Sequence, residues 1–236
     1  MPGFNAKMGM FTPKGGSPIP AELVASWPFI SDANDVSGNG HDLFENGSIS
    51  YSTPEAGVAN LDYLKYFSLS ANPDFTFADA IEDKPFSISL KYKGSAYASG
   101  RIWLISKRQG EVSPREWQIA IVSGTLYFSL FDDINGGTLA AKTSVIFDTT
   151  TEYHIVCRYD GSGSYIGMSI YVNNVSQSIS DVSSGTYIKM NDIGASSLLV
   201  GKEGWTSGGF LVGYMKLLKV YKGVLTSNEI TTLYNE

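Results

Sequence analysis

The feature that most constrains the fold of this chain is a two-residue alternation of apolar and polar side chains in short segments. It is clearest in residues 86–93 and recurs in residues 126–130 and 166–172. Successive side chains of a β-strand point to opposite faces, so this period gives each segment one apolar and one polar face. The sequence therefore predicts a series of half-buried strands.

Short strands of this kind follow one another along most of the chain, with turns between them. Ser123-Gly124 and Asn173-Asn174 supply residue types that tight hairpin turns prefer. Further strands are expected at residues 22–30, 41–49, 63–70, 101–107, 116–122, 153–159, 197–201 and 211–221. No internal repeat and no alternation of strands with long helices is seen. An all-β fold follows, with a sandwich preferred over a barrel.

One short helix is expected at the C-terminal end. Thr226 and Glu229 have the spacing of a capping box, in which each side chain satisfies a backbone N–H of the other. Ile230, Leu233 and Tyr234 then place apolar side chains on one face of a helix. This helix would pack on the sandwich, and its role would be structural.

Residues 1–20 differ from the rest of the chain because glycine and proline prevent regular structure there. Their large apolar side chains are those of Phe4, Met8, Met10 and Phe11. A plain disordered tail usually carries fewer such groups. We predict an extended N-terminal arm at residues 1–20, which either docks on a neighbouring subunit or remains a tail, and one domain at residues 21–236.

Charge and composition exclude several classes of function. The formal net charge is −6 and no basic stripe is present, so nucleic acid is not an expected partner. The chain has no run of about 18 apolar residues, so no membrane-spanning helix is expected. Its N-terminus lacks the pattern of a secretory signal peptide. The single cysteine, Cys157, cannot form an intramolecular disulfide and is interpreted as a buried apolar thiol.

An ordered set of motifs carries a family resemblance. A strand at residues 24–29 precedes the turn Asp35-Val36-Ser37-Gly38-Asn39-Gly40, and the most specific segment is the strand pair 153–160 and 168–173. Together with segments 63–69, 85–90, 104–107, 199–201 and 213–221 and the capped helix, they resemble the laminin G-like, concanavalin A-like jelly-roll family. The resemblance spans residues 22–236. It implies a two-sheet antiparallel jelly-roll sandwich with a short C-terminal helix.

Proteins of this family also include glucanases, so a catalytic pair of carboxylates has to be sought in the sequence. Retaining glycosidases use two carboxylates about 5 Å apart, and the family places acids at alternate positions of one strand. No such run occurs in this sequence. The nearest acidic groups, within residues 79–83 and 148–152, lie in polar segments with ordinary turn explanations. We expect no catalytic residues and a protein that binds.

Calcium is the one cofactor that the sequence suggests. Asp132, Asp133 and Asn135 concentrate hard oxygen ligands in a loop after a strand, which is a composition that Ca²⁺ favours. The family resemblance adds that many members bind calcium at a rim of the sandwich. The alternative is a β-turn rich in Asp, Asn and Gly.

Ligand-binding candidates come from loops. Trp205 and Tyr97 lie in glycine- or serine-rich loops and could stack on sugar rings, although an aromatic side chain that caps the sandwich edge is an equal explanation. Asp35, Asn39 and His41 cluster polar groups in the early turn. These five residues form the predicted glycan site.

Two binding functions are compatible with the sequence. The first is a structural or adhesive component of a virion, such as a phage head decoration, fibre or tail protein, or of another assembly, with protein partners reached through the arm and a homo-oligomeric state. The second is a carbohydrate-binding module of a secreted or surface protein. A glucanase-like hydrolase is the least favoured hypothesis. The expected location is a virion or the extracellular space.

Overall fold

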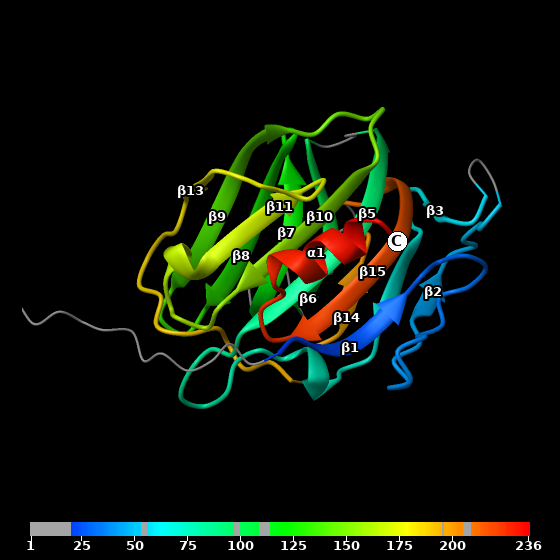
Figure 1. Ribbon diagram of the computed structural model, residues 1–236. Helices are drawn as coiled ribbons and strands as arrows, with labels where there is room; N and C mark the ends of the chain where they lie inside the picture. The colour runs from blue at the N-terminus through cyan, green and yellow to red at the C-terminus, as the bar shows by residue number, and fades with distance from the viewer. Residues whose placement is uncertain (1–19, 53–55, 97–99, 109–113, 195, 205–208) are drawn as a thin grey trace, which may run out of the picture.

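Two antiparallel sheets packed face to face make up the protein (Figure 1). The computed structural model describes residues 20–236 except residues 53–55, 97–99, 109–113, 195 and 205–208. The all-β sandwich and its short C-terminal helix are confirmed. Nearly all of the predicted arm, residues 1–20, lies outside the described residues.

The seven-stranded sheet contains β1 (Glu22–Trp27), β3 (Ala59–Leu61), β5 (Phe86–Ala96), β10 (Tyr153–Tyr159), β11 (Met168–Val172), β12 (Val175–Ser176) and β15 (Val212–Lys222). Its order is β1-β15-β5-β10-β11-β12, and β3 also pairs with β15. β1 pairs with residues 218–222 of β15 and β3 with residues 213–215. The two short strands therefore share one edge of β15, and β5 takes the other.

The eight-stranded sheet contains β2 (Phe44–Asn46), β4 (Tyr66–Leu69), β6 (Arg101–Arg108), β7 (Arg115–Val122), β8 (Thr125–Asp132), β9 (Gly137–Ile146), β13 (Ile179–Asp181) and β14 (Leu198–Val200). Its order is β13-β9-β8-β7-β6-β14-β4-β2. The described residues also form two 3₁₀ turns, η1 (Pro73–Phe75) and η2 (Tyr165–Gly167).

The core lies between the sheets and is formed by the alternating side chains that the sequence singled out. The apolar positions of β5, which are Phe86, Ile88, Leu90 and Tyr92, are all completely buried. Phe86 stacks on Phe77 with ring centroids 4.2 Å apart. Cys157 is buried as predicted, and burial raises the pKa of its thiol.

The predicted hairpin turns are confirmed, and the last long strand is irregular. Ser123, Gly124, Asn173 and Asn174 all have positive φ, as tight hairpin turns require. The last long strand, β15, shifts register against β5 between Met215 and Leu217, where the alternation of apolar residues breaks. Such a shift lets one strand carry an extra residue.

Some strands differ from the prediction. Residues 63–65, expected as strand, form a turn before β4. Strands β3, β9, β12 and β13 are not among the predicted strands. In β9, inward-facing positions carry small residues such as Ala141, so its alternation is weak although the strand pairs with β8 over most of its length.

The C-terminal helix α1 (Ser227–Tyr234) begins with the predicted capping box. Thr226 N donates to Glu229 Oε2 at 2.6 Å, and Glu229 N donates to Thr226 Oγ1 at 3.3 Å. The buried side chains of Ile230 and Leu233 pack against Val156 of β10. Figure 1 shows α1 lying across β10, β5 and β15, so it covers part of the outer face of the seven-stranded sheet. Among the described residues, no helix has the length and apolar character to cross a membrane.

Candidate functional site

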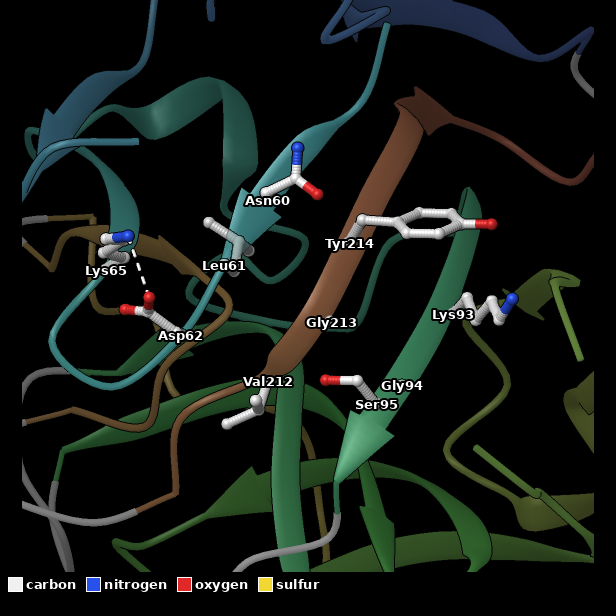
Figure 2. A pocket seen from close by; sticks show the side chains of 10 residues that line it. All are labelled: Asn60, Leu61, Asp62, Lys65, Lys93, Gly94, Ser95, Val212, Gly213 and Tyr214. Carbon is white, nitrogen blue, oxygen red and sulfur yellow. Dashed lines mark hydrogen bonds and ion pairs between the residues drawn. The ribbon is translucent and has the colours of Figure 1, made fainter. Parts of the chain in front are cut away.

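A pocket of about 400 Å³ lies where β3, β15 and β5 run side by side (Figure 2). We call it the glycine pocket, and its lining residues are Asn60, Leu61, Asp62, Lys65, Lys93, Gly94, Ser95, Val212, Gly213 and Tyr214. Figure 2 shows residues of β3 on one side of β15 and residues of β5 on the other. The pocket is therefore built from three chain segments that are distant in sequence.

Two glycines that pair across the sheet form part of the pocket lining. Gly213 of β15 lies opposite Gly94 of β5, next to a register shift at Val212. Gly213 has a φ of +147°, and a Cβ atom there would lie 2.1 Å from the carbonyl oxygen of Lys93. No side chain can occupy that position without a shift of the backbone. The pair lies near the end of β5 and the start of β15, where the two backbones approach closely and no side chain covers the floor of the pocket.

Polar groups line the walls. Asp62 and Lys65 form an ion pair of 2.8 Å at the β3 side of the pocket (Figure 2). Asn60 Nδ2 donates to the carbonyl oxygens of Ser50 and Val58, which holds the side chain of Asn60 in place. These groups are fixed before any ligand binds, and fixed polar groups are what give orientation to a bound molecule.

An aromatic ring and an ammonium group meet on the β5 side. Figure 2 shows the side chains of Tyr214 and Lys93 extending in the same direction from neighbouring strands. Lys93 Nζ lies 5.9 Å from the centre of the Tyr214 ring. The Tyr214 hydroxyl donates to Glu152 Oε2 at 3.0 Å, which fixes the ring. Figure 2 also shows Ser95 Oγ directed across β15 toward Val212.

A strained turn stands beside the pocket. It runs from Asp62 to Lys65, closed by a 3.0 Å bond from Lys65 N to the Asp62 carbonyl. Leu64 has a φ of +70°, which is uncommon for a bulky side chain. Tyr63 is 60% exposed and Leu64 is 69% exposed. Two exposed apolar side chains at the rim, one in a strained conformation, are features that occur at ligand clamps.

A second hollow of about 310 Å³ lies further along β15, beside β1. Apolar side chains, those of Pro28, Ile30, Val36 and Leu217, form part of its wall. Its remaining lining residues are Ser26, Gly57, Lys91, Lys216, Lys219 and Glu236. We call it the apolar hollow. β1 and β3 pair with different parts of the same edge of β15. The apolar hollow beside β1 and the glycine pocket beside β3 therefore lie along one strand.

Of the predicted glycan-site residues, Asp35 is a turn residue in this structure. Its carboxylate accepts hydrogen bonds from the backbone N–H groups of Ser26, Ser37 and His41. These bonds, together with one from the Ser37 hydroxyl, outweigh the effect of burial and lower the pKa of Asp35. These bonds hold the turn at residues 35–40, in which Gly38 and Gly40 have positive φ. The Asp, Ser and Gly residues of the motif that resembles the family therefore have a structural role in the turn.

Asn39 and His41 lie close together in a small polar hollow of about 180 Å³ with Asp74 and Lys222. Asn39 Nδ2 donates to the carbonyl oxygens of Leu23 and Val24, which ties the turn to β1. His41 Nε2 lies 3.4 Å from Asp74 Oδ2. The structure thus brings these two predicted residues together, away from the glycine pocket. The roles of Asp35, Asn39 and His41 in binding stay predictions.

The predicted calcium residues are engaged by N–H donors. Both Asp132 oxygens accept bonds from Asn135 Nδ2, and Oδ2 also accepts from Ile188 N. Asp133 Oδ1 accepts from Nε and Nη2 of Arg115, and Asp133 Oδ2 accepts from the Arg115 backbone N–H. A cation would have to displace these donors, so the arrangement does not fit a preformed Ca²⁺ site. In the described part of the chain, no three His, Cys, Asp or Glu side chains are grouped to hold a metal.

The remaining candidates cannot be placed. Trp205, Tyr97 and the arm residues lie outside the described residues; the arm residues are Phe4, Met8, Met10 and Phe11. Their predicted roles stay predictions.

Sequence reasoning missed the glycine pocket as a site. The one local signal was a glycine between Val212 and Tyr214 within a predicted strand, which suggests a bulge or a close approach. Nothing in the sequence indicates that Gly213 pairs with Gly94. Tyr63 falls in the strand expected at residues 63–70, and its exposed position in a turn follows only from the structure.

Comparison with known proteins gives a family model and a set of similar folds. The model described as the concanavalin A-like lectin/glucanases superfamily matches residues 68–231. In sequence, the chain matches none of the curated proteins. In fold, it is similar to domain 4 of an extracellular GH43 arabinanase from Geobacillus stearothermophilus, solved in complex with arabinotriose. The identity is 18%, the TM-score is 0.65, and the match covers 92% of this chain and 100% of that one.

Two further similar structures come from botulinum neurotoxins. The type G receptor-binding domain has 14% identity and a TM-score of 0.63, with 91% of this chain and 51% of that chain covered. The serotype D ligand-binding domain, in complex with N-acetylneuraminic acid, has 14% identity and a TM-score of 0.64, with 91% and 50% covered. This chain spans about half the length of the toxin domains. At these identities the likeness concerns the fold alone.

Proposed function

The chain belongs to the concanavalin A-like lectin/glucanase superfamily, and on that premise we propose that it is a non-catalytic module that binds glycans in the glycine pocket. The observation that carries the proposal is the pocket itself. It combines a floor without side chains, fixed polar walls and a tyrosine ring held by Glu152. Sugars present hydroxyl groups at their edges and C–H groups on their faces, so they suit this combination of polar and aromatic groups.

The similar structures support glycan binding as a class of function for this fold. The arabinanase domain was solved with arabinotriose and the serotype D toxin domain with N-acetylneuraminic acid. Both ligands are sugars, and both proteins have the fold of this chain. The ligand of this chain is a separate question, because the identities are 18% and 14%.

The acidic groups support binding without catalysis. Asp79 and Asp148 each accept N–H bonds from residues of their own loops. A hydrogen bond from Lys84 also holds the pKa of Asp79 below its usual range, whereas a general acid needs a raised pKa. Burial raises the pKa of Glu116 to about 8, but this side chain is completely buried in the core and out of reach of a substrate.

Filling the pocket should abolish binding. Ser95 is exposed and directed over β15, so in Ser95→Trp an indole would occupy the space of the ligand without entering the core. We expect glycan affinity, measured on a glycan array and then by calorimetry, to fall by roughly 30-fold or more, as for loss of a central contact worth about 2 kcal/mol. The urea midpoint of unfolding should stay close to that of the unchanged protein.

Two other variants make the result specific. Ser144→Trp places the same side chain at an exposed strand position of β9 and should leave glycan binding unchanged. Trp205→Ala tests the loop that the sequence analysis favoured. If Ser95→Trp binds as well as the unchanged protein, or only Trp205→Ala loses binding, the glycine pocket is not the site. Absence of any glycan binding by the unchanged protein would refute the function.

The narrower hypothesis of a virion or other extracellular assembly component is a separate proposal. Its support is the arm of residues 1–20, whose apolar side chains would be costly to leave exposed. A homo-oligomer held by the arm should become monomeric when residues 1–20 are deleted, as measured by light scattering. An unchanged mass after the deletion would contradict this role.

A further inference from the structure

We infer that the ligand of the glycine pocket is an acidic glycan, a sugar chain with carboxylate groups, which runs along β15 from the glycine pocket, beside Lys93 of β5, to the apolar hollow, beside Lys216 and Lys219. The inference rests on the proposed function and specifies its ligand. It is carried by the charges on the outer face of the seven-stranded sheet and by the position of two hollows on one strand.

Lysines gather on this face although the whole chain is acidic, with a net charge of −6. On β5 they are Lys91 and Lys93, and on β15 they are Lys216 and Lys219. We call these four residues the lysine face. Burial is the main cause that lowers the pKa of Lys91, and repulsion from the charge of Lys216 lowers it further, while Glu152 and Glu236 act in the opposite direction. A negative ligand would relieve this repulsion.

The carboxylates of the protein neutralise only part of the lysine face. Lys216 Nζ lies 3.7 Å from Glu152 Oε1, and Lys219 forms an ion pair with Glu236. Lys91 Nζ donates to the carbonyl oxygen of Tyr234, which carries no net charge. For Lys93, no ion pair with a carboxylate is found within the described residues, and its ammonium group lies near the Tyr214 ring. Two glutamates thus face four lysines.

Inside the glycine pocket, as on the lysine face, positive charge is in excess. The other lysine there, Lys65, is neutralised by Asp62 at 2.8 Å. Lys93 is therefore the charge that the lining leaves uncompensated. A sugar carboxylate bound beside Tyr214 would place its negative charge against Lys93, and a charge-assisted hydrogen bond is stronger than a neutral one.

The two hollows lie in line along β15. The glycine pocket is lined by Gly213 and Tyr214, and the apolar hollow by Lys216, Leu217 and Lys219. At a strand rise of about 3.3 Å per residue, Gly213 and Lys219 are separated by roughly 20 Å. This is longer than one sugar residue, so a chain fits the face better than a monosaccharide does. The apolar wall of the second hollow can contact the C–H face of a further sugar.

The test compares each acidic polysaccharide with its own uncharged form. Polygalacturonate, alginate and hyaluronate are titrated as sodium salts and as methyl esters, which keep the sugar backbone and remove the charge. We expect at least one salt to bind about tenfold or more tightly than its ester. Lys93→Gln and Lys216→Gln should each weaken that binding, by roughly tenfold and threefold, and high salt should weaken it further. Lys142→Gln, on β9 of the other sheet, should have no effect.

The outcomes separate this inference from the proposed function. One outcome is that esters or neutral glycans bind as tightly as the salts, that Ser95→Trp blocks this binding and that Lys93→Gln does not change it. The pocket then binds glycans, and the assignment to acidic glycans is wrong. If poly-L-glutamate binds as tightly as the polysaccharides, the face attracts polyanions in general, which overturns the glycan assignment. If no glycan of either charge binds, both the inference and the proposed function are wrong.

Discussion

Replacing Gly213 by alanine is expected to lower the free energy of unfolding by about 3 kcal/mol or more, because two costs combine at this position. The first is a φ of +147°, which side chains rarely adopt. The second is steric, since the new Cβ would lie 2.1 Å from Lys93 O and 2.9 Å from Gly94 Cα. Both neighbours are backbone atoms of the paired strand and cannot move independently of β5. Urea denaturation followed by tryptophan fluorescence measures the loss.

A matched substitution separates conformational strain from collision. Gly136 has a φ of +69°, and nothing lies within 4 Å of the position that its Cβ would occupy. Gly136→Ala should therefore cost about 1 kcal/mol, the price of a positive φ alone. If Gly213→Ala costs no more than Gly136→Ala, the close approach of β15 and β5 at the glycine pocket is wrong. In that case the pocket floor has a different shape.

Replacing Lys107 by methionine is expected to cost about 3–5 kcal/mol near pH 8, because it leaves the buried carboxylate of Glu116 without its cation. Both side chains are completely buried, with Lys107 Nζ 3.8 Å from Glu116 Oε2. Glu116 Oε1 accepts from Phe77 N at 2.7 Å, whereas Oε2 has no hydrogen-bond partner. Lys107 Nζ also donates to Thr76 Oγ1 at 2.7 Å. The pair thus attaches the segment around η1 to the eight-stranded sheet.

The loss should depend on pH in a defined direction. Burial raises the pKa of Glu116 from 4.5 to about 8, so the folded protein keeps a proton that the unfolded chain releases. This contribution to stability is complete below about pH 4.5 and is lost as the pH rises through about 8. Lys107 opposes the trend, because burial lowers its pKa and its charge favours the ionised Glu116. Lys107→Met removes both opposing effects, so its stability should fall more steeply with pH than that of the unchanged protein.

Urea denaturation at pH 5 and pH 8 measures this difference. The double variant Lys107→Met with Glu116→Gln removes both charges and keeps an acceptor for Phe77 N. It should recover most of the stability lost at pH 8, since a neutral replacement of a buried pair is often well tolerated. An equal loss for Lys107→Met at pH 5 and pH 8 would show that the two groups do not interact as described.

Local patterns in the sequence were sufficient for the strands and turns. The alternation in residues 86–93 predicted β5 because the pleat of a strand imposes the same period. The spacing of Thr226 and Glu229 predicted the start of α1 because the backbone N–H groups of a first helical turn need acceptors. The turn at Asp35 was predicted for a similar reason. β9 was missed, since Ala140 and Ala141 give little contrast between its two faces.

The candidate site could be predicted only in part. Loops with Trp205 or Tyr97 were reasonable choices from composition, but their positions lie outside the described residues. The glycine pocket depends on which residue of β15 lies opposite which residue of β5. A shift of register would place a residue with a side chain opposite Gly94 and change the lining of the pocket. The burial of Lys107 against Glu116 also depends on strand register and could not be predicted. In the sequence, each of these charged residues is expected to be exposed.

By itself, the sequence determined the all-β class, the resemblance to the family, most strand positions and the capped helix. Each of these follows from interactions between residues close together in the chain. Only the tertiary structure decided that Gly94 and Gly213 meet, that Tyr63 is exposed at a turn and that four lysines share one face. These facts depend on strand order and register, which are set by the packing of the whole sandwich. The binding surface is therefore a property of distant segments brought together, and local sequence patterns carry little information about it.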